Sequence, residues 1–518
     1  DDVESRGLGD VYKRQMQYVV SNQQMKEAER RCNESGTSYY QMMENAGTCC
    51  AEFILGTIPV SADILVMCGS GNNGGDGLVI TRMLRQNGRN AAVLLVSGAP
   101  KTADAAENLR RLPAGTPVYQ PEQLDEAFSG RECVVDCIYG TGFHGELRGN
   151  VPEIIAAANK CSYRIAVDVP SGVNSDTGEL DTRCLRPTHT LVLAALKQGM
   201  VNAPASDILG ELHLLDIGIG EDCFASNNVA FLTDETLRRP FPPHGRNTHK
   251  GTFGRLAGFA GSLSFNGAAF MCAQAALRSG VGLYFAAAPV SAVRIIAAGL
   301  HEAVYVPLPE TSDGFADISG DTLEKIVRPK LDSASAVLVG CGLGNSENTR
   351  RLTEFVIRSA TCPVIIDADG INSISANIDV LKERTGDTIL TPHPLEFSRM
   401  TGVPVAEIQR DRLGMTSQFA MRYGATVLLK GADTVIASPD GSMCVNSGAC
   451  RGLSKGGSGD VLTGIIGAFA AQGIEPFRAA CAGVYCHWKA ADILTHRMPA
   501  ESILPTDVIA ALPEVYCG

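Results

Sequence analysis

The feature that most constrains the fold is a repeated alternation of short apolar runs with longer segments of helical length. In the first part of the chain the runs are rich in Val, Ile and Leu and most end in Gly or Ser: Ala62–Gly69, Ala91–Gly98, Glu132–Gly140, Tyr163–Gly172 and His189–Leu196. Segments such as Gly77–Gly88 lie between most of them. This order predicts βα units that form a parallel sheet covered on both faces. Ligands of such sheets bind at the carboxyl ends of the strands.

A second alternating region follows, with its own motifs. Its apolar runs again end in glycine or polar residues: Gly254–Ser262, Gly282–Pro289, Ser335–Gly344, Pro363–Asn372, Thr388–Pro394 and Ala425–Ser438. Two helical segments, Ser458–Gly473 and Pro476–His496, come last. Between the regions, Arg238–Asn247 contains three prolines and is typical of a connector.

We therefore expect an α/β protein with two domains, residues 16–225 and 226–518. A chain of 518 residues is too long for one ordinary domain. Residues 1–15 precede the first methionine, Met16, and we interpret them as a non-native leader outside the fold.

Charge and composition exclude several classes of partner. The net charge is −12, so the chain has no basic surplus for binding nucleic acid or an anionic membrane. No apolar run is long enough to predict a membrane span. The 17 cysteines contain no C-x-x-C pair, which favours reduced thiols, a cytoplasmic protein and neither a disulfide framework nor a structural zinc site.

The first glycine loop lies in Met67–Ile80 and fits the spacing G-x-G-x-x-G at Gly69, Gly71 and Gly74. Two details oppose an ordinary dinucleotide site. The next strand ends in Ser97 and Gly98 and lacks the acid that binds a ribose hydroxyl. Asp76 would repel a pyrophosphate. The alternative is a tight turn in which Asp76 caps a helix.

Three strand ends change this interpretation, because they bring polar side chains to one rim of the sheet. These side chains are Asn73, Asp76, Asp136, Asp168 and Ser171. Carboxylates, an amide and a hydroxyl form a hard-oxygen site that suits an alkali or alkaline-earth cation. A carboxylate there can also act as a proton-transfer base. The alternative is a set of helix caps.

The first half closely resembles the N-terminal YjeF family, the NAD(P)H-hydrate epimerases. The resemblance rests on Ser21–Glu29, Gly71–Gly77, Gly140–Gly142 and Asp168–Gly172. It implies a Rossmann-like, three-layer αβα domain in which Asn73, Asp136 and Ser171 hold K⁺ and Asp168 moves a proton at C6 of the hydrated nicotinamide. The implied substrate contacts are Asn72, Asn73, Gly74, Gly75, Asp76, Gly140, Thr141, Gly142, Phe143, His144, Gly145, Glu146 and Asp168.

A second glycine loop, in Lys455–Gly464, precedes an apolar helix. Its amides and the helix end suit phosphate oxygens, and Asp460 is placed to accept a proton from an attacking hydroxyl. The alternative is that Asp460 caps the helix. Lys430 lies in another turn rich in backbone donors, and His393 and Glu396 lie on a loop stiffened by prolines.

The second half resembles the C-terminal YjeF family, the ADP-dependent NAD(P)H-hydrate dehydratases of the ribokinase-like αβα superfamily. The matching motifs are His249–Gly254, Asn266–Ala269, Gly340–Gly344, Asp367–Asn372, Thr391–Pro394, Lys430–Ile436 and Gly456–Asp460. Two segments depart from the family pattern: Ala449–Ser454, which usually reads G-N-x-G-M-A, and Cys341, where the family has proline.

This second resemblance implies a set of site residues and a reaction. Ala268, Gly342, His393 and Asp460 would line the hydrate site. The adenine nucleotide would contact Lys430, Gly431, Ala432, Asp433, Thr434, Gly456, Gly457, Ser458 and Gly459. ADP would phosphorylate the C6 hydroxyl with Mg²⁺ present and leave AMP, and loss of phosphate would restore the reduced nicotinamide.

We therefore expect a cytoplasmic, homo-oligomeric repair enzyme that epimerises R and S NADHX and NADPHX and dehydrates the S form. Two alternatives stay open: a ribokinase-type small-molecule kinase fused to a nucleotide-binding domain, and a first domain that only senses nucleotides. We interpret Cys486, His487 and Trp488, and likewise Met42 and Met43, as packing residues rather than ligands.

Overall fold

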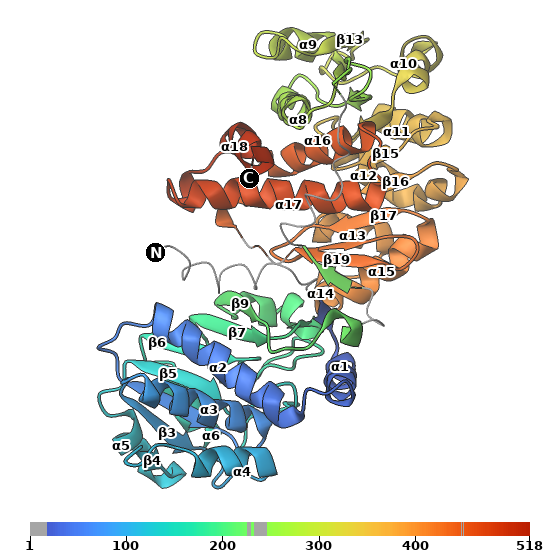
Figure 1. Cartoon of the computed structure of the whole chain (residues 1–518). Helices are drawn as coiled ribbons and strands as arrows, with labels where there is room; N and C mark the ends of the chain where they lie inside the picture. Colours follow the sequence, from blue (N-terminus) through green and yellow to red (C-terminus); the bar gives the residue numbers. More distant parts are fainter. Residues whose placement is uncertain (1–17, 225–228, 233–245, 447, 449, 518) are drawn as a thin grey trace. The chain divides into compact units, whose positions relative to one another are not determined.

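The computed structural model describes residues 18–224, 229–232, 246–446, 448 and 450–517 (Figure 1). The chain divides into two compact units, one ending at Ala230 and the other beginning at Phe231. The leader at residues 1–15, the predicted boundary between residues 225 and 226, and most of the predicted connector lie outside the described residues.

The first unit contains a seven-stranded parallel sheet of order β4-β3-β2-β5-β6-β7-β9. All five predicted strands are present, and β4 and β9 were not predicted. The strands are β2 (Ile64–Cys68), β3 (Ala91–Leu95), β4 (Val118–Tyr119), β5 (Cys133–Cys137), β6 (Tyr163–Val167), β7 (His189–Leu193) and β9 (Glu211–Leu215). A separate parallel pair joins β1 (Val19–Val20) to β8 (Leu196–Lys197).

Helices cover both faces of this sheet, which gives three layers (Figure 1). Along β2, Ile64, Val66 and Cys68 belong to one apolar core, whereas Leu65 and Met67 belong to the other. The first core includes residues of α1 (Asn22–Glu34), α2 (Tyr39–Thr57) and α3 (Asn72–Gln86), and the second includes residues of α5 (Leu124–Phe128) and α6 (Val151–Ala158). A further helix, α4 (Ala103–Arg110), packs on α3. The predicted α/β class is confirmed.

The glycines of the first loop allow close approach of backbone to backbone. A Cβ on Gly69 would lie 2.0 Å from the carbonyl oxygen of Ile138, and one on Gly74 would lie 1.9 Å from that of Gly69. Gly71 is the N-cap of α3, so the alternative in which Asp76 caps this helix is wrong. Asp76 lies one turn inside α3 and is buried.

The second unit contains a ten-stranded sheet of order β10-β19-β18-β17-β16-β15-β14-β11-β12-β13. The seven neighbouring strands β17-β16-β15-β14-β11-β12-β13 are parallel. β18 pairs antiparallel with β17, and β19 pairs antiparallel with β18. The strands are β10 (Val229–Phe231), β11 (Arg255–Phe259), β12 (Leu283–Pro289), β13 (Val304–Leu308), β14 (Ala336–Val339), β15 (Val364–Ile366), β16 (Thr388–Leu390), β17 (Thr426–Leu429), β18 (Thr434–Ala437) and β19 (Met443–Asn446).

Helices also flank the second sheet. On one side lie α8 (Asn266–Arg278), α16 (Ser458–Ala471), α17 (Pro476–Thr495) and α18 (Pro505–Cys517), which pack on one another (Figure 1). The others are α9 (Val290–Ile296), α10 (Arg328–Ser333), α11 (Glu347–Ser359), α12 (Asp369–Ile374), α13 (Pro394–Thr401), α14 (Val405–Arg410) and α15 (Arg412–Tyr423). Each helix in the described residues is too short or too polar to cross a membrane.

The crowding at Gly74 predicts a loss of stability on adding one methyl group. Gly74→Ala should lower the free energy of unfolding of the first unit by roughly 1–3 kcal/mol, because the loop must move away from the Gly69 carbonyl. Gly56, in α2, has open space at its Cβ position. Gly56→Ala is the matched control and should be neutral or stabilising by up to about 1 kcal/mol. Equal urea-unfolding midpoints for the two variants would contradict the prediction.

Candidate functional site

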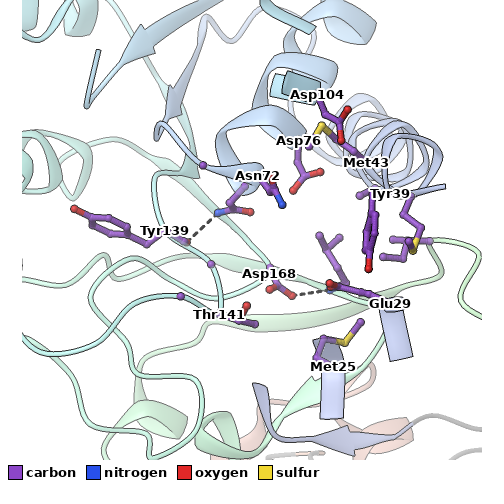
Figure 2. A pocket seen from close by; sticks show the side chains of 18 of the residues that line it. Met25, Glu29, Tyr39, Met43, Asn72, Asp76, Asp104, Tyr139, Thr141 and Asp168 are labelled. Carbon is purple, nitrogen blue, oxygen red and sulfur yellow. Dashed lines mark hydrogen bonds between the residues drawn. The ribbon is translucent and has the colours of Figure 1, made fainter. Parts of the chain in front are cut away.

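The first unit has a cavity of about 440 Å³ at the carboxyl ends of its central strands. Its walls come from α1, α2, the start of α3 and the loops that follow β5 and β6. The lining residues are Met25, Lys26, Glu29, Tyr39, Met42, Met43, Ala46, Ser70, Gly71, Asn72, Asn73, Asp76, Ser97, Asp104, Ile138, Tyr139, Gly140, Thr141, Gly142, Asp168, Leu193, Lys197 and Ile217. In Figure 2, Asp76, Asp168 and Glu29 point toward the same space.

Asp136, at the end of β5, lies at the base of this site and is fully buried. Its carboxylate accepts hydrogen bonds from the Ser171 hydroxyl at 2.7 Å, the Ser171 amide at 2.8 Å and the Ile138 amide at 3.1 Å. Burial raises the pKa of Asp136 to about 6 although these hydrogen bonds lower it. The Asn73 amide donates to the carbonyl of Tyr139 at 2.9 Å (Figure 2). The Tyr139 amide donates to the Ser171 hydroxyl at 3.0 Å, so Tyr139 links the predicted cation ligands Asn73, Asp136 and Ser171 in one hydrogen-bonded cluster.

Asp168, directly after β6, faces the cavity and is held by a lysine. The Lys197 ammonium donates to its carboxylate and, at 2.9 Å, to the carbonyl of Leu193. The side chain of Lys197 is only 1% exposed. Asp168 has φ of +68°, a conformation that costs free energy for a residue with a side chain and recurs at functional sites. A buried lysine in contact with a buried carboxylate marks this pair as a candidate functional feature of the cavity.

Two further carboxylates share the cavity with this pair. Burial, reinforced by the charges of Asp168 and Glu29, raises the pKa of Asp76 well above its usual value. Burial and Asp168 also raise the pKa of Glu29, against the opposing effect of Lys197. The cavity therefore places two carboxyl groups with raised pKa values beside the carboxylate that Lys197 contacts.

The structure brings most of the predicted substrate contacts of the first unit to this cavity. Asn72, Asn73, Asp76, Gly140, Thr141, Gly142 and Asp168 line it. Gly74 and Gly75 lie behind the wall in α3, and Phe143 packs on Tyr139 in the core. His144, Gly145 and Glu146 lie outside the lining, and their contact with a ligand stays a prediction.

Sequence analysis missed Lys197, Glu29, Tyr39 and Asp104 in this cavity. Lys197 follows the apolar run His189–Leu196, and a lysine directly after a buried strand was the available signal. Met42 and Met43 are buried as predicted, and both also line the cavity.

The second unit has a cavity of about 420 Å³ between the two motifs that carry its backbone donors. It is lined by Lys430, Gly431, Ala432, Thr434, Asn446, Gly448, Cys450, Arg451, Leu453, Ser454, Ser458, Gly459, Leu462, Val484, His487 and Trp488. Six of the nine predicted nucleotide contacts are among these residues. Asp433, Gly456 and Gly457 are not.

The turn that follows β17 is fixed by the buried side chain of Arg412. Its guanidinium donates to the carbonyl oxygens of Asp433 at 2.8 Å, Leu429 at 3.0 Å and Lys430 at 3.3 Å. A Cβ on Gly431 would lie 2.6 Å from this guanidinium, so only glycine fits the turn as it stands. Arg412 thereby holds the Lys430–Thr434 backbone in place at the cavity.

Asp460, the third residue of α16, lies in a cluster of acidic groups around Lys430. Gly457 is the N-cap of α16, so the alternative in which Asp460 caps the helix is wrong. Burial and the nearby Asp367 raise the pKa of Asp460 to about 6. Burial disfavours the charge of Lys430, but Asp367 and Glu396 outweigh it and raise the lysine pKa.

Lys430 and Asp367 form the central ion pair of this cluster. Their charged atoms are 2.8 Å apart, and Thr463 also donates to Asp367, at 2.6 Å. Glu396 lies 4.0 Å from the same lysine. The cluster joins the ends of β15, β16 and β17 to the start of α16, where the pKa of the Asp460 carboxyl is raised.

The predicted hydrate contacts of the second unit lie outside the cavity lining, around this acidic cluster. Gly342 is next to Ala268, since a Cβ on Gly342 would lie 2.9 Å from that of Ala268. His393 is the N-cap of α13 and accepts the amides of Leu395 and Glu396 through Nδ1. Burial and Lys430 lower its pKa. Their contact with substrate stays a prediction.

His487 and Trp488, interpreted from sequence as packing residues, are both wall residues of the second cavity. His487 is buried, its Nε2 has no hydrogen-bond partner among the described residues, and burial lowers its pKa to about 4. A neutral imidazole and an indole ring on one wall provide a surface for a planar ring. The helical periodicity of α17 gave no sign of this cavity.

Two family models match the chain, one in each unit. Residues 39–199 match the model described as YjeF-related protein N-terminus. Residues 259–514 match the model described as NAD(P)H-hydrate dehydratase.

Curated relatives match both units together. The chain is 35% identical to the bifunctional NAD(P)H-hydrate repair enzyme Nnr of Moorella thermoacetica over 496 residues, which is 92% of each chain. It is 32% identical to the Nnr enzyme of Escherichia coli over 490 residues, 93% of this chain and 90% of that one. Among solved structures, the ADP/ATP-dependent NAD(P)H-hydrate dehydratase of Bacillus subtilis is 33% identical over 55% of this chain and 97% of its own, with a TM-score of 0.47.

Proposed function

The chain belongs to the family of bifunctional NAD(P)H-hydrate repair enzymes, and from that premise we propose how its two units divide the work. The first unit equilibrates the R and S forms of NADHX and NADPHX, and the second dehydrates the S form with ADP. The observation that carries the proposal is that each unit places a buried carboxylate–lysine pair, Asp168–Lys197 or Asp367–Lys430, at a site next to a glycine loop.

In the first unit we assign proton transfer at C6 to Asp168. Lys197 compensates the charge of the carboxylate and fixes its position through the Leu193 carbonyl. Asp76, whose pKa burial raises, faces the same cavity and is the acid that we assign opposite Asp168. A base and an acid around one ring are what inversion of a carbon centre requires. The loop at Asn72–Asp76 and the Gly140–Gly142 turn bind the hydrated ring.

We also propose that Asn73, Asp136 and Ser171 hold a potassium ion beneath this ring. The residues fit such an ion, because the oxygens of a carboxylate, an amide and a hydroxyl form a hard donor set. Among the described residues, Asp136 is fully buried and has no ion pair with a side-chain cation. A bound cation would neutralise the charge of Asp136 and would fix the loops after β5 and β6, which contain Tyr139 and Ser171.

In the second unit we assign the base to Asp460. Its carboxylate takes the proton of the C6 hydroxyl as that oxygen attacks the terminal phosphoryl group of ADP, and AMP leaves. Cleavage of the C6–O bond, with loss of a proton from the neighbouring ring carbon, then releases inorganic phosphate and restores the double bond of the reduced nicotinamide. The amides of Gly456–Gly459 at the start of α16 stabilise the charge of the transferring phosphoryl group.

The adenine nucleotide occupies the second cavity, between the Lys430–Thr434 turn and the wall formed by His487 and Trp488. Phosphoryl transfer calls for Mg²⁺, which would be held by phosphate oxygens together with carboxylate oxygens of the acidic cluster. Ala268, Gly342 and His393 contact the hydrated ring. We propose that the protein is a cytoplasmic homo-oligomer and that the boundary between its two domains lies near residue 225.

One absorbance trace tests both activities. A mixture of R and S NADHX is incubated with the enzyme, ADP, K⁺ and Mg²⁺, and recovery of reduced-nicotinamide absorbance is followed. A single rise that consumes both epimers is expected. A rise that stops after the S form would overturn the epimerase proposal. No ADP-dependent rise, with ATP-dependent phosphorylation of a small alcohol instead, would favour a ribokinase-type kinase.

Two variants should separate the two reactions, and each is the control for the other. Asp168→Asn should lower epimerisation by at least about a hundredfold while S-NADHX is dehydrated at the wild-type rate, because only the first unit loses its proton carrier. Asp460→Asn should show the reverse pattern. Loss of both activities in either variant, with unfolding midpoints unchanged, would contradict the assignment.

Dehydration should depend on pH through Asp460. The carboxylate acts as a base only when ionised, so with its pKa at about 6 the rate should rise with pH and level off above that value. At about pH 5 the rate should be roughly a tenth of its plateau. The measurement is the single-turnover dehydration of S-NADHX against pH at saturating ADP. A rate independent of pH over this range would exclude Asp460 as the base.

Potassium should stabilise the first unit through Asp136. At equal ionic strength, KCl should raise the thermal unfolding midpoint of the first unit more than LiCl does, because Li⁺ is too small for this set of oxygens. Asp136→Ala should abolish the difference. Asp104→Asn, on the cavity rim, should keep it. Equal midpoints in both salts for the wild-type protein would remove the potassium proposal.

A further inference from the structure

Two histidines and a glutamate meet at the amino ends of the last two strands of the first sheet. His189 begins β7, Glu211 begins β9 and His213 lies two residues further along β9. In the parallel register His189 pairs with Glu211, and Leu191 pairs with His213. Since side chains two residues apart share a face of a strand, Glu211 and His213 lie on the same face. Leu193, at the other end of β7, lines the first cavity, so this cluster lies at the opposite end of the strand.

The three side chains already have the spacing of ligands around one metal ion. His189 Nδ1 is 3.3 Å from His213 Nε2 and 3.7 Å from a carboxylate oxygen of Glu211. His213 Nε2 is 3.5 Å from the other oxygen. Ligands about 2.0–2.1 Å from a tetrahedral zinc ion are separated from one another by roughly 3.3–3.4 Å. These three groups therefore need only small shifts to bind one ion.

Packing holds the two imidazoles in place and leaves them accessible. The ring of Phe53, from α2, lies with its centroid 4.4 Å from that of His213 and 5.7 Å from that of His189. The side chains of the two histidines are 18% and 23% exposed, and that of Glu211 is 68% exposed. An ion can reach the donors from solvent, and rings held by packing lose little freedom on binding it.

We propose that His189, Glu211 and His213 form a zinc-binding site of the first unit. Two imidazole nitrogens and a carboxylate suit Zn²⁺, and three protein ligands leave the fourth position of the tetrahedron for water. β9 is an edge strand with a single neighbour in the sheet, β7. The metal joins these two strands through their side chains and thereby stabilises this edge of the sheet.

The same groups have a metal-free alternative, which is a hydrogen bond between the two imidazoles with Glu211 free in solvent. A second cluster, Cys272, Cys341 and Asp460, also has its donor atoms close together, but it belongs to the proposed dehydratase site. The test must distinguish metal bound by His189, Glu211 and His213 from metal bound by this thiol cluster. Co²⁺ makes the distinction, because thiolate ligation adds an intense sulfur-to-cobalt absorption band.

The experiment is titration of the whole chain with Co²⁺, followed by displacement with Zn²⁺. The wild-type protein should take up one Co²⁺ with the visible bands of a tetrahedral site and without sulfur-to-cobalt absorption. His189→Ala and His213→Ala should each weaken binding at least about tenfold, since each removes a direct ligand. Glu211→Gln, which removes a charge from an exposed side chain, should also weaken binding without affecting folding. His301→Ala, at an exposed histidine elsewhere, is the matched control.

Thermal unfolding provides the second measurement. Zn²⁺ should raise the unfolding midpoint of the wild-type protein and the His301 variant, because an ion that binds only the folded state stabilises it. The rise should be absent in His189→Ala and His213→Ala. Equal Co²⁺ affinities in the wild type and Glu211→Gln, or spectra dominated by sulfur ligation in every variant, would overturn the proposed site. The result is independent of catalysis, so it stands or falls apart from the proposed repair function.

Discussion

A carboxylate buried at the end of a parallel strand requires a partner, and the arrangement of both sites follows from how that partner is supplied. Transfer of an isolated charge from water into the interior is costly enough that the group must be neutralised, hydrogen-bonded or paired. Asp136 accepts hydrogen bonds from Ser171. Asp168 forms an ion pair with Lys197, and Asp367 forms one with Lys430. Each partner comes from a different segment of the chain, so each pair fixes two segments at one rim of the sheet.

The buried acidic groups fall into two kinds according to whether a lysine contacts them. Asp168 and Asp367 have a lysine in contact, which stabilises a negative charge at a fixed place. Among the described residues, Asp76 and Asp460 have no lysine in such contact, and burial raises the pKa of both, that of Asp460 to about 6. Each proposed active site therefore combines a carboxylate paired with a lysine and a carboxylate whose pKa burial raises.

Sequence analysis was strongest where the information is local. Runs such as Glu132–Gly140 have the length and composition of a buried strand, and glycine or aspartate at their ends marks the rim. It failed where the information is tertiary. Lys197 comes 29 residues after its partner Asp168, and no periodicity marks a lysine that burial will force into an ion pair. His487 lies on a helix that is apolar almost throughout, so its position on a cavity wall was equally hidden.

The two loops are both rich in glycine, but the surroundings of their glycines differ. In the first loop, neighbouring carbonyl oxygens occupy the Cβ positions of Gly69 and Gly74, so these glycines serve the packing of the loop. In the second loop, Gly456 has open space at its Cβ position, and the nearest atom at that of Gly459 is the Lys430 ammonium at 3.4 Å. Open amides beside an ammonium group suit a phosphoryl group, whereas a crowded turn beside Asp76 suits an uncharged ring. What surrounds a glycine therefore decides its chemistry, and its spacing in the sequence does not.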